Sequence, residues 1–329
     1  MLKNEISQHI IQPVEYVQAA DDFGMKMFNA LDVDIESSLA AYENFHSDWD
    51  IKVADRANNL IENRVDLVVA DIPYLSLAAA AKAGIPSIAL CSLNWADVLE
   101  YYLSKDEGKE ILEIMRAAYN SAEYFLQPAP SMKMKGLDNL REIGPVCKPG
   151  EFLREELDKI LPDKEDVWVV LVGMGGMPYD IDYSQWPRFI LSRPVYYIVP
   201  VTNQTGCNWI IPLEKWESNY SDLVASVDLV VTKPGYGMFV ESAVAGVPVL
   251  YVERNNWPDV SSLTKWLAAV AHCRAISLEV FQAGEFQDEM TSLLEQGHYS
   301  PVEPTGNREA AQLIVNMLLN KPKEKPGKG

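Results

Sequence analysis

The stretch VDLVVTKPGYGMFVESAVAGVPVLYV, from Val227 to Val252, repeats an earlier one, VDLVVADIPYLSLAAAAKAGIPSIAL, from Val65 to Leu90. The offset is 162 residues, with ten identities in 26 positions. Each copy begins with an unbroken Leu-Val-Val run, which is typical of a parallel strand buried on both faces. A small-residue helix follows and ends in Ala-Gly, a β-branched residue and Pro, which cap and stop a helix. Another apolar strand comes next, so each copy predicts a β-loop-α-β unit of an open parallel sheet.

The composition fits two α/β domains and limits the partners. A chain of 329 residues with 48% hydrophobic residues is long enough to bury two cores. The net charge of −19 argues against a nucleic-acid surface and against docking on anionic lipid. The four cysteines form no CxxC pair, which indicates reduced side chains. No stretch approaches the ~20 apolar residues of a membrane span, and MLKNEISQHI lacks a signal-peptide core, so we expect a cytoplasmic protein.

The predicted elements place one domain in each half of the chain. Residues 1–64 are expected to be mainly helical, with IIQPVEYV as a weak strand candidate. The stretch 125–150 is rich in proline and glycine and has no long periodic segment, so we place the domain boundary there. The predicted organisation is a first Rossmann-like domain over 1–145, a second over 146–305, a terminal helix over 306–320 and a disordered tail over 321–329.

A seam between a predicted strand and helix carries Lys233, Gly235, Tyr236 and Gly237. In an open parallel sheet, ligands bind at the carboxyl ends of the strands. The two glycines allow main-chain N–H groups to approach an anion, the helix dipole favours negative charge, and Lys233 adds a positive charge. The first copy has Asp71 in place of Lys233 and no glycine, so the second half is the one predicted to bind a phosphate. The alternative is that Lys233 is a solvated surface residue.

Two further features point to the same ligand. Glu241 falls about one turn into the helix, where the first copy has Ala79, and a carboxylate there can accept hydrogen bonds from the vicinal hydroxyls of a ribose. Alternatively, Glu241 only complements the helix dipole. A second glycine loop, with Gly173, Gly175 and Gly176, ends the first strand of the same half. Such loops are common turns, but here two of them converge on one cleft.

These motifs resemble those of the GT-B glycosyltransferases. Within KPGYGMFVESAVAGVP, the ESAVAGVP pattern is similar to that of the bacterial peptidoglycan N-acetylglucosaminyltransferase, and TKPGYG resembles the glycosyltransferase-like half of plant arabinokinases. The resemblance covers about residues 60–320 and implies two Rossmann-like parallel-sheet domains that face each other across a cleft. It implies that the second domain binds a nucleotide sugar, with Glu241 at the ribose and both glycine loops at the diphosphate. It also places Asn256 and Asp259 at the donor sugar and sends the terminal helix back to the first domain.

The N-terminal side departs from this pattern. GT-B members begin with a strand and a Gly-rich or His-containing loop that faces the acceptor. This sequence reaches its Leu67 strand with one β-loop-α unit too few, judged by unit lengths of ~30 residues. The resemblance is therefore to a GT-B protein that lacks the first N-terminal unit, and either the first domain or the active site is incomplete.

The acceptor side offers weaker candidates. A transfer needs a base to take the acceptor proton. Asp71, at a strand end, and His46, with acidic neighbours, are the weak candidates for this role. The alternatives are a helix-capping Asp71 and a structural His46. Three residues after the next strand end are expected to line the acceptor side: Asn94, Trp95 and Asp97.

The leading prediction is transfer of a sugar from a nucleotide diphosphate donor to an unidentified acceptor, without a metal and without a cofactor. No His, Cys and carboxylate cluster has zinc spacing, and Asp180 and Asp182 follow a glycine loop instead of a buried strand. Two alternatives stay open. One is a non-catalytic module that binds a nucleotide sugar or a partner, and the other is a sugar-nucleotide epimerase or hydrolase of the same fold.

Overall fold

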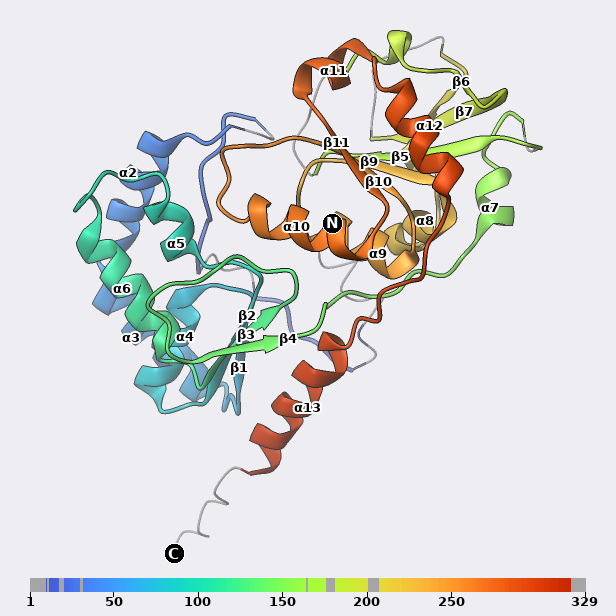
Figure 1. The fold of residues 1–329 in the computed structure, drawn as a ribbon. Helices are drawn as coiled ribbons and strands as arrows, with labels where there is room; N and C mark the ends of the chain where they lie inside the picture. The colour runs from blue at the N-terminus through green and yellow to red at the C-terminus, as the bar shows by residue number, and fades with distance from the viewer. Residues whose placement is uncertain are drawn as a thin grey trace, which may run out of the picture.

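Two mainly parallel sheets organise the chain and lie in separate lobes (Figure 1). The computed structural model describes residues 10, 12–17, 21–29, 32–163, 165–175, 181–200 and 207–320. The two repeat copies form the same unit in each lobe, with α4 (Tyr74–Ala83) in the first and α9 (Tyr236–Ala245) in the second. Gly84 and Gly246 follow these helices with left-handed φ values of 68° and 73°, which confirms the predicted helix ends.

The first sheet is parallel throughout, and its strands follow chain order: β1 (Val68–Ala70), β2 (Ser87–Leu90), β3 (Tyr124–Pro128) and β4 (Leu140–Ile143). The lobe also contains α2 (Ile35–His46), α3 (Trp49–Glu62), α4, α5 (Trp95–Glu100) and α6 (Lys109–Asn120). Buried side chains of α4, α5 and α6, among them Leu77, Leu99 and Met115, cover one face of the sheet. This packing leaves the carboxyl ends of the strands facing the second lobe.

The structure extends the first sheet beyond the sequence prediction. Both β4 and most of β3 fall in the stretch 125–150, which showed no periodic pattern, because strands of five and four residues are too short to display one. The helical prediction for the N-terminal region holds for α2 and α3, whereas 12–17 and 21–29 are not helical. Among the described residues β1 pairs with β2 alone, and Val69 at this sheet edge is 46% exposed.

The second sheet has the strand order β11-β10-β9-β5-β7-β6, with β8 paired to β7 and with β6 as the antiparallel member. Its strands are β5 (Trp168–Gly173), β6 (Phe189–Ile190), β7 (Arg193–Val199), β8 (Ile210–Pro212), β9 (Leu229–Thr232), β10 (Val249–Val252) and β11 (Cys273–Ile276). The helices of this half are α7 (Arg154–Asp158), α8 (Tyr220–Ser226), α9, α10 (Val260–Val270), α11 (Leu278–Ala283), α12 (Gln287–Gln296) and α13 (Gly306–Leu319). Two 3₁₀ turns complete it: η1 (Tyr183–Gln185) and η2 (Leu213–Lys215).

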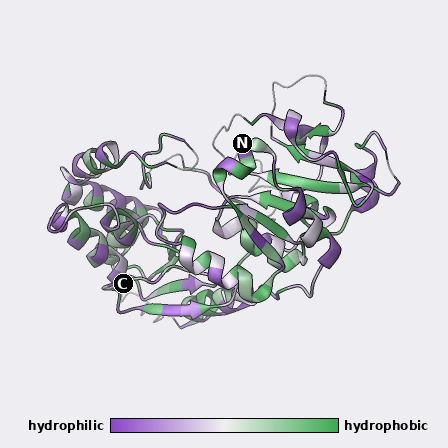
Figure 2. Ribbon diagram, turned by 45° about the horizontal axis from the view of Figure 1, so that its top comes forward, coloured by the Kyte–Doolittle hydropathy of each residue, from purple (hydrophilic) through white to green (hydrophobic). Residues whose placement is uncertain are grey.

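The second sheet is buried on both faces, as the unbroken apolar runs predict. All four residues of β9 are buried, and successive residues contribute to two separate cores: Leu229 and Val231 to one, Val230 to the other. The apolar strands lie inside this lobe, with more polar helix surfaces outside them (Figure 2). A sheet held in this way provides a rigid base for the loops at its strand ends.

Within the described residues, the chain crosses between the lobes after β4 and again before α13, and these two crossings touch. After β4 it enters the second lobe through Gly144 and Pro145, and it returns as α13, whose Leu313 and Met317 pack on the free face of the first sheet. The Gly306 N–H donates to the Pro145 carbonyl at 3.1 Å. A Cβ on Gly306 would lie 2.0 Å from the Gly144 carbonyl oxygen, so this close approach requires glycine.

Candidate functional site

The two glycine loops meet at the carboxyl edge of the second sheet. Gly173 ends β5, and Gly175 has a φ of 84° and lies against Lys233: a Cβ there would be 3.1 Å from the lysine Cε. Gly176 lies outside the described residues. Gly235 is the N-cap of α9, and a Cβ on Gly237 would meet no described atom within 4 Å. Among the described residues, the N–H groups of Tyr236, Gly237 and Met238 in the first turn of α9 have no hydrogen-bond partner, which makes this turn a favourable place for an anion.

Beside this turn of α9 lie three charged side chains, of which Lys233 is partly buried and Arg254 and Asp259 are buried. Arg254 and Asp259 are 7% and 5% exposed, and they follow β10 in the loop that leads to α10. Burial lowers the pKa of Lys233, and the neighbouring Arg254 lowers it further, while Asp259 partly offsets the effect. Burial also lowers the pKa of Arg254 and raises the pKa of Asp259 to about 6. Two cations thus share one carboxylate.

Arg254 is held in place without satisfying all of its donors. Its Nε donates to Asn256 Oδ1 at 3.3 Å, and its guanidinium lies 4.4 Å from the centre of the Trp257 ring. Its Nη2 and the Oδ1 of Asp259 are buried and have no hydrogen-bond partner in the described part of the chain. An unsatisfied buried guanidinium costs free energy, which an anionic ligand would recover. Arg254 was not among the predicted site residues, although Asn256 and Asp259 from the same loop were.

Glu241 lies on α9 in a partly buried position. Burial raises the pKa of its carboxyl to about 7. Burial raises the pKa of Tyr220 and of the Cys147 thiol, and the charge of Glu241 raises both further, so the carboxylate lies near both side chains. No hydrogen bond to Glu241 is present among the described residues. Its carboxylate oxygens are therefore open to donors from a ligand, such as sugar hydroxyls.

Asp71 faces this edge from the first lobe. It directly follows β1. Burial raises the pKa of the Cys91 thiol, and the charge of Asp71 raises it further. Burial also raises the pKa of Tyr236, at the start of α9, to about 12, and Asp71 adds the smallest contribution. The Tyr236 hydroxyl accepts a hydrogen bond from the Val146 N–H at 2.9 Å, so Tyr236 also ties α9 to the crossing between the lobes. The two copies of the repeat thus bring Asp71 and the glycine seam to the same cleft from opposite sides.

The three predicted acceptor-side residues have structural partners. Asn94 caps α5 and donates to Asp97 Oδ2 at 2.9 Å. Asp97 is 6% exposed and also accepts from Arg116 at 2.7 Å. The Trp95 indole donates to Asp22 Oδ2 at 2.9 Å. Burial raises the pKa of Asp22, and Asp71 adds to the effect, so Asp22 is a carboxylate near Asp71 that the sequence did not single out.

His46 belongs to an aromatic cluster. Its ring stacks on Tyr74 with 5.7 Å between the centroids, and its Nδ1 lies 2.8 Å from the Tyr42 carbonyl oxygen. Burial lowers the pKa of the imidazole. These contacts give His46 a packing role. Asp182, which follows the first glycine loop of the second lobe, accepts a hydrogen bond from the Ser184 N–H at the start of η1. Asp180 lies outside the described residues.

A contact from the first lobe closes one end of the cleft. The Tyr102 hydroxyl donates to the Asn256 carbonyl oxygen, and Trp257 packs against the core of the first lobe. The loop that carries Arg254 and Asp259 therefore touches both lobes, and Tyr102 is a further residue that the sequence did not indicate.

Two kinds of feature are missing from the described part of the chain. Within residues 10–320, apart from the gaps given above, no three His, Cys, Asp or Glu side chains are grouped as metal ligands. Over the same residues, no helix combines the length and the apolar character that a bilayer crossing requires.

Comparisons with solved structures define the class of fold. UGT89C1 from Arabidopsis thaliana in complex with UDP has a TM-score of 0.53 and 13% identity, over 86% of this chain and 80% of that one. The calicheamicin glycosyltransferase CalG4 has a TM-score of 0.55 and 14% identity, over 87% and 84%. Both are GT-B glycosyltransferases. The fold is therefore GT-B, as predicted, with two Rossmann-like lobes across a cleft.

One characterised plant protein is similar in sequence. L-arabinokinase from Arabidopsis thaliana is 26% identical over 259 residues, which is 75% of this chain and 24% of L-arabinokinase. The match thus spans about a quarter of that relative. No protein-family model matches the chain.

Proposed function

We propose that the chain binds a nucleotide diphosphate sugar at the carboxyl edge of its second sheet and transfers the sugar to an acceptor in the cleft. The observation that carries this proposal is the pair of cations beside the first turn of α9, the partly buried Lys233 and the buried Arg254. Asp259 balances one of the two charges. A diphosphate would balance the other and occupy the free N–H groups of the helix.

The remaining donor contacts follow from this placement. With the diphosphate at Gly173, Gly175 and the start of α9, the ribose would lie along α9, where Glu241 accepts from its two hydroxyls. The sugar would extend toward Asn256 and Asp259. The structure of UGT89C1 with UDP supports uracil as the first nucleobase to test. The structure of the same protein with UDP-L-rhamnose supports a nucleotide diphosphate sugar as the ligand class.

For the transfer step, we assign residues 1–145 to the acceptor and 146–305 to the donor. The acceptor hydroxyl oxygen attacks the anomeric carbon, the bond from this carbon to the diphosphate oxygen breaks, and Asp71 takes the proton. Lys233, Arg254 and the N–H groups of α9 stabilise the charge on the departing diphosphate. These fixed cations perform the role that a divalent ion has in other transferases, so the proposed transfer is independent of metal.

Donor binding is tested by thermal unfolding with UDP, ADP and GDP. A ligand at a hundred times its dissociation constant adds ~2.7 kcal/mol to the free energy of unfolding. We expect one diphosphate to stabilise the wild type and to bind at least tenfold more weakly to Glu241→Ala. Glu253→Ala, at an exposed position on the neighbouring loop, is the matched control. If no diphosphate stabilises the wild type, the seam is a structural turn and the proposal is wrong.

The ribose contact of Glu241 and the role of Asp71 as the catalytic base have their own tests. The 2′-deoxy form of the bound diphosphate should bind more weakly than the ribo form to the wild type, and the two should bind equally to Glu241→Ala. Asp71→Asn should keep donor affinity and lose at least a hundredfold in the rate of sugar release from the donor in the presence of acceptor. An unchanged rate would rule out Asp71 as the base.

A further inference from the structure

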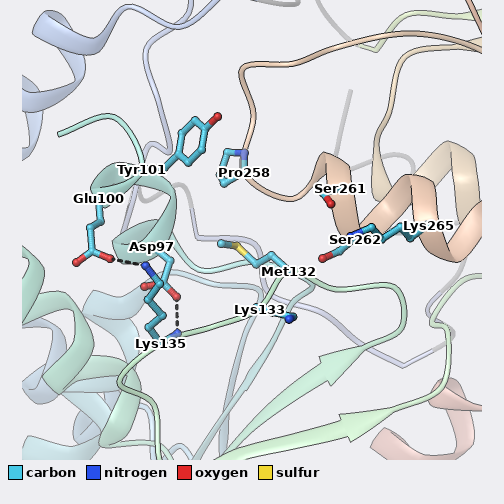
Figure 3. Close-up of a pocket in the computed structure, with 10 residues that line it drawn as sticks. All are labelled: Asp97, Glu100, Tyr101, Met132, Lys133, Lys135, Pro258, Ser261, Ser262 and Lys265. Carbon is cyan, nitrogen blue, oxygen red and sulfur yellow. Dashed lines mark hydrogen bonds and ion pairs between the residues drawn. The ribbon is translucent and has the colours of Figure 1, made fainter. Parts of the chain in front are cut away.

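A pocket opens between the lobes, at the first turn of α10. It has a volume of about 410 Å³, and its walls come from α5 and residues 132–135 of the first lobe and from residues 258–265 of the second (Figure 3). The donor contacts do not account for it, and of the residues predicted for the acceptor side Asp97 lines it. Since both lobes contribute to its wall, any occupant contacts both of them.

The carboxylates in this pocket are already neutralised. Asp97 lies 2.7 Å from Arg116, and Glu100 lies 3.0 Å from the same guanidinium. Glu100 also lies 3.6 Å from the Lys135 ammonium (Figure 3). The Asp97 Oδ2 also accepts from the Lys135 N–H at 2.8 Å. Two carboxylates and two cations therefore cancel within this network.

Two further lysines leave the pocket positively charged. Lys133 from the first lobe and Lys265 from α10 line it and have no carboxylate partner among the described residues. The excess of two positive charges stands out in a chain with a net charge of −19. Paired ammonium groups from opposite walls favour an anion between them.

The rest of the lining limits the size and character of the ligand. Ser261 and Ser262 present hydroxyls at the start of α10, and no hydrogen bond to either hydroxyl exists within the described chain. Tyr101, Met132 and Pro258 supply apolar surface. Hydroxyls and apolar surface beside a cationic centre suit a polar ring with one acidic group.

Residues of the pocket directly follow residues of the donor site in the sequence. Asp259, the N-cap of α10, interacts with Lys233 and Arg254, and the serines of the pocket follow it within one turn. The pocket also adjoins the carboxyl end of the first sheet, because the Met132 N–H donates to the Ser92 carbonyl, just after β2, at 2.9 Å. We propose that this pocket binds the acceptor and that the acceptor is a sugar-sized molecule with a phosphate or carboxylate group, held by Lys133 and Lys265. The role of this ligand as the acceptor rests on the proposed function, whereas the anion site itself does not.

Binding is measured by calorimetry at low salt with three probes: glucose 6-phosphate, glucuronate and glucose. At least one anionic probe should bind, and glucose should bind at least tenfold more weakly. The anionic probe with the higher affinity shows whether the site prefers a phosphate or a carboxylate. The double variant Lys133→Gln with Lys265→Gln should bind the anionic probe at least tenfold more weakly than the wild type does. Lys82→Gln with Lys215→Gln changes the charge equally at exposed positions elsewhere and should have no effect.

A separate UDP titration distinguishes this inference from the proposed function. UDP should bind the Lys133 and Lys265 double variant as it binds the wild type. If an anionic probe binds as expected and UDP does not bind the wild type, the anion site stands and the donor assignment fails. If no anionic probe binds the wild type, or if binding survives the double substitution, the acceptor-pocket proposal is overturned.

Discussion

Replacing Glu241 by glutamine should stabilise the ligand-free protein at alkaline pH and hardly affect it at acid pH. Burial raises the pKa of this carboxyl from 4.5 to about 7, so the folded state disfavours its ionised form. Glutamine keeps the shape of the side chain and removes the charge. The ionised Glu241 carboxylate is therefore expected to lower the free energy of unfolding when no ligand is bound.

The sign and the size follow from the linkage between proton binding and folding. Below the ordinary pKa of 4.5 the carboxyl is protonated in both states, so its ionisation costs nothing. The cost grows as the pH rises through the interval between 4.5 and about 7 and is complete above it. At ~1.4 kcal/mol for each pKa unit, the upper limit is about 3 kcal/mol. The remaining contact of Glu241 with solvent reduces the expected value to about 1–2 kcal/mol.

The assay is urea unfolding of the wild type and Glu241→Gln at pH 5 and pH 8, supported by thermal melts. The gap in free energy of unfolding between the two proteins should be larger at pH 8 by about 1–2 kcal/mol, or roughly 2–4 °C in melting temperature for each kcal/mol. Glu253→Gln, at an exposed position, should show no such pH-dependent gap. An equal gap at both pH values would show that the Glu241 carboxylate is hydrated and would refute the reasoning.

Three further substitutions test the seam, the crossing and the contact between the lobes. Gly237→Ala should keep or raise stability, because alanine is favoured in helices by ~0.5–1 kcal/mol and its Cβ meets no described atom within 4 Å. It should lower UDP affinity at least tenfold by calorimetry, and unchanged affinity would place the ligand elsewhere. Gly306→Ala should lose about 1–3 kcal/mol in urea unfolding, since its Cβ would lie 2.0 Å from the Gly144 carbonyl oxygen; wild-type stability would contradict the tight crossing. Tyr102→Phe should cost about 1 kcal/mol and speed hydrogen exchange in residues 254–259, whereas unchanged exchange would exclude the contact as a brace.

The parts of the site that were predictable from sequence are local. Lys233, Gly235 and Glu241 belong to one strand-loop-helix unit, in which the positions of backbone donors follow from the sequence itself. The internal repeat supplied a second copy for comparison, so a lysine in place of Asp71 could be recognised as a departure. Short-range geometry and an internal reference were sufficient to nominate these residues as candidates.

The parts that escaped prediction depend on contacts between distant residues. Arg254 is buried because Trp257 stacks on it and because Tyr102 reaches the same loop from the other lobe, 154 residues away from Asn256 in sequence. Asp22 meets Trp95 across 73 residues. The short strands β3 and β4 are specified by their neighbours in the sheet instead of by their own pattern. No local periodicity records such pairings.

The contact between the two crossings has a mechanical consequence. Two connections at separate points would hold the lobes rigidly, whereas connections joined at Gly144 and Gly306 behave as one pivot. Once the contact of Tyr102 and Trp257 between the lobes is released, motion of the lobes is reduced to a swing about this pivot, with the largest displacement at the end far from it. Residues near the pivot, such as Cys147, keep their surroundings during the swing. A spectroscopic label on the first lobe and another on the second would therefore report one angle, and that angle alone would describe how far the cleft is open.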